Sequence, residues 1–345
     1  MERTELLRSL CTHCAPSGRE GALADWISAQ LAGNVDELHR DALGNLIAVK
    51  RSKKEHAKTI LLDAHMDEIA MMVTGITEEG FLRIADITGI DSRVMLAAEV
   101  TVHGREELFG VIACRPPHLT TAEERKKSPK VTEMIIDIGM GKERAETLVS
   151  IGDLATLRGP FGQLTGSRVS GKSLDNRTGD AVLLTVFDTL KQEELPYHLA
   201  LLFSVQEEAG LRGAKVGAYT VDPDECIVVD VSFARTPDTK PEETGQMGGG
   251  PMIGIAPILS RSISGRLCTL AQEKKIPCQR EVMGGSTGTN AYSVQIARGG
   301  VPVGLISIPL RYMHTAIECI DLADFDNTCR LLTAYLRDRG EALSR

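Results

Sequence analysis

Residues 198–214 have the sequence HLALLFSVQEEAGLRGA, in which an apolar run meets two adjacent glutamates, Glu207 and Glu208, before a turn that contains Gly210 and Gly213. The apolar run predicts a buried strand. Two neighbouring carboxylates at the end of such a strand repel each other and lose hydration, which is costly unless a positive charge lies nearby. The stretch therefore predicts a strand that ends beside a positively charged partner.

Strands and helices alternate through the rest of the C-terminal half. Predicted strands cover residues 198–206, 225–232 and 301–309, and predicted helices cover 181–192, 261–275 and 321–340, the last capped by Gly340. A predicted helix at 3–12 and β-rich runs at 45–51 and 59–73 come before them. This alternation is typical of an open α/β sheet with helices on both faces.

The segment from about residue 70 to 165 has a different pattern. Short alternating runs such as FLRIADI, EVTVHG and LATLRG are separated by glycine and charged turns, which indicates an all-β unit. Within it, residues 115–130 are polar and flanked by proline, and they predict a mobile surface loop. The sequence therefore predicts a doubly wound α/β domain interrupted by an inserted small β domain.

The composition is that of an ordinary globular protein and argues against several partners. The chain has 345 residues, more than one hydrophobic core usually serves, so two domains are expected. Acidic residues outnumber basic ones by 47 to 39, which argues against nucleic acid as a partner. Neither a signal-peptide pattern nor a run of about 18 apolar residues is present. With eight scattered cysteines, these features predict a soluble cytoplasmic protein that does not contact membranes.

The stretch LLDAHMDEI places His65 and Asp67 two residues apart, which on a strand puts both side chains on one face. A metal-binding imidazole commonly has a carboxylate beside it that orients the ring. A structural hydrogen-bonded pair is the alternative, and the pair alone does not decide between the two interpretations.

Three further candidates lie beside apolar runs. Asp175 occupies a polar turn ahead of a helical run, Asp230 ends the run CIVVD, and His314 follows a strand and a proline. Asp175 also suits the N-cap of the helix. Because open α/β sheets bind ligands at the carboxyl ends of their strands, these residues are candidate metal ligands together with His65 and Glu208.

These five side chains would supply two neutral imidazoles and three carboxylates. Two divalent cations with one bound hydroxide would balance the three negative charges and would provide the positive partner that the adjacent glutamates require. Ligands of this kind suit zinc, cobalt or manganese. Two ions roughly 3.5–4 Å apart, bridged by one carboxylate, activate water for hydrolysis. Glu207 would stay outside the metal shell as the general base.

The motifs DAHMDEI, GKSLDNRTG, VQEEAGLRGA, VDVS and IPLRYMHT occur in the order found in the M42 family of metallo-aminopeptidases, and CAPSGRE and IDIGMG extend the match over nearly the whole chain. The chain resembles this family, which includes glutamyl aminopeptidases and proteins named endoglucanases. The resemblance implies a zinc-exopeptidase-like catalytic domain at residues 1–68 and 166–345, and an inserted β-barrel domain at 69–165. It also implies short peptides as substrates and a homo-oligomer, commonly a tetrahedral dodecamer, that the inserted domain helps to build.

The resemblance also assigns roles to individual residues. Carried over by motif, His65 and Asp230 would bind one ion, Glu208 and His314 the other, Asp175 would bridge them, Glu207 would be the base and Asp67 would orient His65. The two divalent ions would be zinc or cobalt, with manganese as a further candidate. One position departs from the family pattern, because Asn290 stands where the family commonly has Asp. A neutral amide there would weaken a contact with the substrate's α-ammonium group if the side chain faces the substrate.

Other functions stay open at this point. A related metal centre would serve a deacylase or amidohydrolase of small N-acyl amino acids, and a non-catalytic peptide-binding or assembly protein could use the same scaffold. A glycosidase needs two carboxyl groups that face each other across a sugar. Glu207 and Glu208, if both lay on a strand, would point to opposite faces and would not supply that pair.

Overall fold

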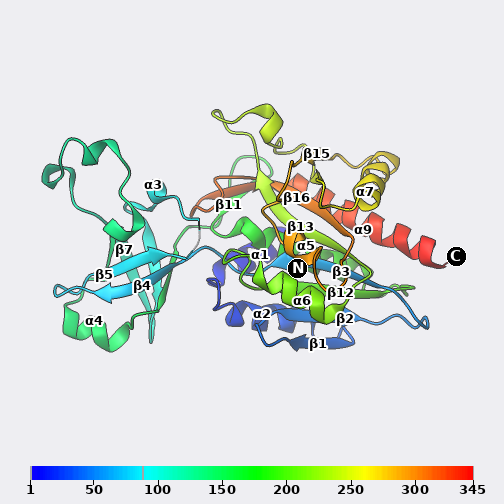
Figure 1. Cartoon of the computed structure of the whole chain (residues 1–345), viewed down its shortest axis with the longest axis horizontal. Helices are drawn as coiled ribbons and strands as arrows, with labels where there is room; N and C mark the ends of the chain where they lie inside the picture. The colour runs from blue at the N-terminus through cyan, green and yellow to red at the C-terminus, as the bar shows by residue number, and fades with distance from the viewer. Residues whose placement is uncertain (1, 88, 345) are drawn as a thin grey trace.

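The computed structural model describes residues 2–87 and 89–344, which form a large mixed sheet with helices and a separate barrel to one side of it (Figure 1). The chain leaves the sheet after β3 (Thr59–His65), builds the barrel, and returns to the sheet at β10 (Gly162–Gln163) and β11 (Arg168–Gly171). This architecture confirms the predicted doubly wound α/β sheet with an inserted β-barrel. The domain boundaries near residues 68 and 166 stay a prediction.

In the described part of the chain the sheet has eleven strands. Nine follow in the order β1 (Glu37–Arg40), β2 (Leu46–Lys50), β12 (His198–Ser204), β3, β13 (Glu225–Phe233), β16 (Val303–Arg311), β17 (Glu318–Asp321), β11 and β10, while β14 (Met252–Ile255) and β15 (Gln279–Val282) extend from β16. The four central strands β12, β3, β13 and β16 are parallel. Their carboxyl ends therefore meet at one edge, where open α/β sheets bind their ligands.

Helices cover both faces of this sheet. One face packs against α1 (Arg3–Thr12), α2 (Gly21–Leu31), α5 (Leu174–Leu190), α7 (Arg261–Glu273) and α9 (Leu322–Ser344), and the other against α6 (Arg212–Val221) and α8 (Ala291–Val294). Alternate residues of β3 serve the two faces: Leu62 and Ala64 belong to the first apolar cluster, and Leu61 belongs to the second. Burial on both faces explains why the central strands are almost continuously apolar.

The barrel closes in the order β4 (Met71–Ile76), β5 (Leu82–Asp86), β8 (Ile135–Asp137), β7 (Glu107–Ala113), β6 (Glu99–His103) and β9 (Leu154–Leu157), with α3 (Ser92–Met95) and α4 (Lys142–Leu148) beside it. It has an apolar core of its own, because alternate residues such as Val100 and Val102 point inward. The predicted surface loop at 115–130 is largely exposed and contains the short 3₁₀ turns η1 (Pro117–Leu119) and η2 (Glu124–Lys126). A third 3₁₀ turn, η3 (Val131–Glu133), precedes β8, and η4 (Pro241–Glu243) lies beyond β13.

The predicted end of the terminal helix was wrong. The helix does not end at Gly340, because α9 continues to Ser344 and Gly340 does not have the left-handed backbone of a C-cap. The strand predicted over residues 225–232 is β13, which runs to Phe233, so Asp230 ends the apolar run CIVVD but lies inside the strand. Across residues 2–87 and 89–344, no helix combines the length and the apolar character needed to span a bilayer.

Candidate metal centre

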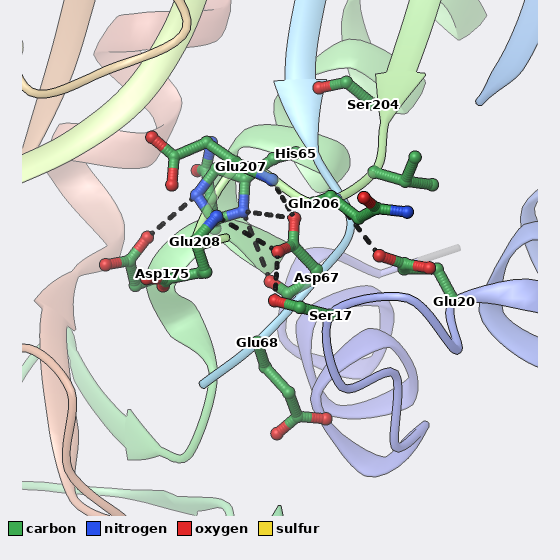
Figure 2. Close-up of polar contacts among 12 residues, drawn as sticks. Ser17, Glu20, His65, Asp67, Glu68, Asp175, Ser204, Gln206, Glu207 and Glu208 are labelled. Carbon is green, nitrogen blue, oxygen red and sulfur yellow. Dashed lines mark hydrogen bonds and ion pairs between the residues drawn. The ribbon is translucent and has the colours of Figure 1, made fainter. Parts of the chain in front are cut away.

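The predicted ligands come together at the carboxyl edge of the central strands. His65 is the last residue of β3, Asp230 lies in β13, Glu207 and Glu208 follow β12, Asp175 lies at the start of α5, and His314 follows β16. Figure 2 shows His65, Asp175, Glu207 and Glu208 converging from three different segments. The sheet topology thus gathers residues that are up to 249 positions apart, from His65 to His314.

Asp175 occupies the middle of the cluster. Its Oδ1 lies 3.1 Å from Nε2 of His65, and its Oδ2 lies 3.4 Å from Nε2 of His314. Each imidazole has a second carboxylate nearby: Asp230 Oδ1 is 3.8 Å from His65 Nε2, and Glu208 Oε1 is 3.3 Å from His314 Nε2. One carboxylate therefore joins two imidazole–carboxylate pairs.

Asp175 is available for this position because its neighbour caps the helix. The Oδ1 of Asn176 accepts the backbone N–H of Gly179 at 2.9 Å, which is an N-cap contact. Asp175 itself has an extended backbone, with φ −80° and ψ 106°. The N-cap interpretation of Asp175 is therefore wrong, and its carboxylate is directed to the two histidines.

Both imidazoles present Nε2 to the cluster and have an acceptor at Nδ1. Nδ1 of His65 lies 3.2 Å from the carbonyl oxygen of Asp67 and 3.4 Å from its Oδ1. Nδ1 of His314 lies 3.1 Å from the carbonyl oxygen of Gly89, in the segment between β5 and α3. A neutral ring that donates from Nδ1 keeps the Nε2 lone pair free, which is the usual arrangement of a metal-binding histidine.

The charges in the cluster also suit a cation. Burial, reinforced by the surrounding carboxylates, raises the pKa of Glu207 to about 9, and burial raises the pKa of Glu208 and of Asp230 as well. Burial lowers the pKa of His314, but hydrogen bonds to Asp175 and Glu208 outweigh it and raise that pKa to about 11. Without a cation the cluster would therefore retain protons. Divalent cations could replace them.

Two overlapping sets of side chains have the spacing of metal ligands. In the sets His65, Glu207, Asp230 and His65, Asp175, Glu208, the ligand atoms lie within 4.8 Å of one another. Imidazole and carboxylate donors without a thiolate suit zinc, cobalt and manganese. The residues present thus fit a metal centre.

The adjacent glutamates reach the same cluster because the strand stops before them. β12 ends at Ser204, and Gln206 has a left-handed backbone with φ +55°, so residues 205–208 form a turn. The strand predicted to extend to residue 206 was too long. The turn removes the strand alternation that would have sent Glu207 and Glu208 to opposite faces.

Asp67 holds this turn. β3 ends at His65, so Asp67 lies beyond the strand and the two residues do not share a strand face as predicted. The Asp67 carboxylate accepts the backbone N–H groups of Glu207 at 2.9 Å and of Glu208 at 3.1 Å, and the hydroxyl of Ser17 at 2.6 Å. Asp67 therefore contacts both the His65 imidazole and the glutamate turn.

Glu318 is an important residue that the sequence analysis missed. It is buried in β17, and its carboxylate accepts the backbone N–H of Asp175 at 2.9 Å and of His314 at 2.8 Å. Burial raises its pKa well above the usual range. The available signal was a glutamate inside the otherwise apolar run AIECI.

A second buried carboxylate, Glu68, is balanced by cations. Its Oε2 lies 2.6 Å from Nζ of Lys172, and its Oε1 lies 3.3 Å from the guanidinium of Arg177. Burial opposes ionisation of Glu68, but Lys172 and Arg177 outweigh it and lower the pKa. Glu68 also accepts the backbone N–H of Ala15, so it connects the N-terminal segment to the edge of the centre.

Asn290, which stands where the resembled family commonly has Asp, has two polar partners within the protein. Its side chain is buried, and its amide nitrogen donates to Asp63 Oδ2 at 2.8 Å and to Ser204 Oγ at 2.9 Å. The amide nitrogen is therefore engaged by Asp63 and Ser204, and the effect of Asn290 on substrate binding stays a prediction.

Known proteins resemble the chain over almost its whole length. Residues 44–331 match the family model described as M42 glutamyl aminopeptidase. The lysyl aminopeptidase of Pyrococcus furiosus is 32% identical over 97% of this chain and 96% of its own length. The glutamyl aminopeptidase of Lactococcus lactis is 30% identical over 97% of this chain and 96% of its own length.

A solved structure agrees with these relatives. The TET1 peptidase of Pyrococcus horikoshii, described as able to assemble into a tetrahedron or a large octahedral shell, superimposes with a TM-score of 0.85 at 32% identity, over 96% of this chain and 98% of its own. The family match, the relatives and the shared fold agree with the arrangement of buried histidines and carboxylates. The chain belongs to the M42 glutamyl aminopeptidase family and is a peptidase.

Proposed function

We propose that the chain is an aminopeptidase with two divalent metal ions that hydrolyses the N-terminal residue of short peptides. One observation carries the proposal: Asp175 offers one oxygen to His65 and the other to His314, and each imidazole has its own second carboxylate. A shared carboxylate between two such pairs is the donor arrangement of a two-ion hydrolytic centre.

The proposed ligand sets follow from these contacts. His65 and Asp230 would hold one ion, Glu208 and His314 the other, and Asp175 both. Zinc or cobalt suits these donors best, and manganese is the third candidate. When bound, the ions would polarise the scissile carbonyl group and lower the pKa of a water molecule.

Glu207 is proposed to move the proton. Glu207 is 9% exposed and has the spacing of a metal ligand with His65 and Asp230, but each of the two proposed ions already has three protein ligands without it. Its carboxylate would accept a proton from the attacking water and pass it to the leaving amine. Asp67 would orient His65 through Nδ1 and fix the backbone of the glutamate turn.

The preferred N-terminal residue is not set by the family, since one relative is named for lysine and another for glutamate. We also propose that the chain forms a homo-oligomer through the barrel, by analogy with the TET1 peptidase, which is described as able to assemble into a tetrahedron or a large octahedral shell. Exposed apolar side chains on the barrel support this, among them Met72 and Phe109. The eight free cysteines support a cytoplasmic location.

A substrate panel tests the proposal. The protein, purified and loaded in turn with zinc, cobalt and manganese, is incubated with peptides that differ in the N-terminal residue, each with a free or an acetylated N-terminus. We expect loss of single residues from free N-termini only, and two metal ions per chain by elemental analysis. Cleavage restricted to acetylated substrates would favour a deacylase, and a folded protein with less than one ion per chain would favour a non-catalytic binding role.

A further inference from the structure

We infer that Glu20 is a positioning residue for Glu207, an inference that rests on the proposed role of Glu207 as the base. Glu20 belongs to the segment APSGRE, residues 15–20, which none of the metal-binding roles involves. Its Oε1 accepts the backbone N–H of Gln206 at 3.0 Å (Figure 2). Glu20 therefore acts on the residue immediately before the base.

The turn that carries the base needs such support. Gln206 has a φ of +55°, a conformation that residues with side chains rarely adopt. This conformation is what lets Glu207 and Glu208 both reach the cluster, since an extended chain would separate them. A residue that holds Gln206 in place thus determines where the Glu207 carboxylate lies.

Three consecutive backbone N–H groups of the turn donate hydrogen bonds to buried carboxylates. The N–H of Gln206 goes to Glu20, and those of Glu207 and Glu208 go to the two oxygens of Asp67. Hydrogen bonds to ionised acceptors are stronger than those between neutral groups. Because Asp67 also contacts His65, Glu20 is the member of this set that touches no predicted metal ligand.

The segment 15–20 is itself fixed, so Glu20 can act as a rigid support. Oε1 of Glu20 also accepts the backbone N–H of Gly18 at 2.8 Å, and Glu20 is only 5% exposed. The hydroxyl of Ser17 donates to Asp67 Oδ2, which connects the same segment to the second carboxylate. The segment thus holds the turn at two points.

The first experiment compares Glu20→Ala with the wild-type metal-loaded protein on the best peptide substrate. Loss of the acceptor should free Gln206 and misplace the base, lowering kcat about 10- to 100-fold with KM changed by less than about threefold. The metal content should stay equal to that of the wild type. Glu20→Gln keeps an acceptor oxygen at the same place and should restore kcat to within about threefold of the wild-type value.

Arg19→Ala is the matched control, because Arg19 adjoins Glu20 and its side chain is exposed. It should have the kcat of the wild type. A thermal melt of each variant checks folding, and if Glu20→Ala fails to fold, Glu20→Gln and Ser17→Ala are compared instead, with a fall in kcat at full metal content expected for Ser17→Ala. Equal kcat values for all folded variants and the wild type would overturn the inference.

A double variant tests whether Glu20 acts through Glu207. In a Glu207→Gln background, Glu20→Ala should cost nothing further in kcat, because there is no base left to position. Losses that multiply would overturn the inference. An inactive wild-type protein would instead reject the proposed function, so the two failures can be told apart.

Discussion

The two halves of the proposed metal centre, His65 with Asp230 and His314 with Glu208, are built in different ways. His65 and Asp230 are strand residues, and their side chains are 2% and 6% exposed. Glu208 and His314 lie on loops; the Glu208 side chain is 6% exposed, as for Asp230, but the His314 side chain is 24% exposed. The strand half is fixed by the packing of the sheet, whereas the loop half depends on hydrogen bonds to its backbone and to one imidazole nitrogen.

Because the two halves are fixed in different ways, they should differ in their affinity for a metal ion. Strand residues in a close-packed core move little, so the His65 half is preorganised before a cation arrives. The loops must be held in place, and part of the binding free energy is spent on ordering them. We therefore expect the His314 half to bind its ion more weakly and to lose it first on dialysis against a chelator.

The largest effect is expected at Glu207. Its carboxylate lies close to His65 and Asp230 of the strand half, but the residue itself belongs to the turn after β12. Glu207→Gln should lower kcat by about 10²–10⁴-fold while two ions per chain remain, because the change removes the proton acceptor and leaves the ligands intact. Steady-state kinetics and elemental analysis of the same sample check this. A Glu207→Gln protein with full activity would remove Glu207 from the role of base.

The second prediction compares one carboxylate from each half. Glu208→Gln should abolish binding of the weaker ion and leave one ion per chain, whereas Asp230→Asn should weaken the tighter one. Titration with zinc or cobalt, followed by calorimetry, measures both sites. If Glu208→Gln and Asp230→Asn lose the same ion, the division of the centre into two halves is wrong.

Glu318→Gln sharpens the comparison without changing any ligand. Glu318 accepts two N–H groups, from Asp175 and His314, and an amide can accept only one of them without bringing two donors together. We expect the affinity of the loop-half ion to fall about 10- to 100-fold, as for other outer-shell changes. Calorimetric titration checks this, and an unchanged second binding constant would show that Glu318 does not support that half.

A smaller effect is expected at Gly89, where the barrel approaches the centre. Its carbonyl oxygen accepts from His314, and a Cβ added at Gly89 would lie 3.2 Å from His314 Nδ1. Gly89→Val should tilt the His314 imidazole and lower the affinity for the ion of the loop half by about threefold to tenfold. Gly139→Ala is the control for the loss of a glycine, because Gly139 lies in the same barrel and has open space around an added Cβ. Since Gly139 has a φ of +69°, the fold of this variant is checked first.

Much of this arrangement could be predicted from the sequence, because it rests on local patterns. Apolar runs predicted the central strands, and polar residues within or after these runs, with Asp175 ahead of a helix, supplied the five candidate metal ligands and the proposed base. The carboxyl edge of a parallel sheet brings such residues together whatever their separation along the chain. On that argument alone, His65 and His314 could be expected to lie in the same cluster.

The supporting residues could not be predicted, because their contacts depend on turns and on long-range packing. Gln206 adopts a left-handed backbone that no residue type in VQEE announces. Glu318 resembles any strand glutamate until the topology places β17 beside the start of α5. The same holds for Asn290, whose partner Asp63 is 227 positions away. Single-residue geometry of this kind is visible only in the folded chain.

Asn290→Asp tests the support beneath the strand half and should have the smallest effect on activity. The Asn290 amide donates to Asp63, two residues before His65 in β3, so an aspartate at 290 would bring a second carboxyl group against a buried one. The unpaired acceptors should lower the free energy of unfolding by about 1–3 kcal/mol. Because the hydrogen bonds of Asp63 within residues 2–87 and 89–344 do not involve a proposed ligand side chain, kcat should change by less than about threefold. Asn290→Ala, which removes the donor without adding a charge, is the matched variant. Denaturant melts compare the stability of both variants with that of the wild type. If Asn290→Asp is as stable as the wild type and Asn290→Ala is not, the pocket around Asp63 accommodates two carboxyl groups. The strand half is then less rigidly packed than its burial suggests.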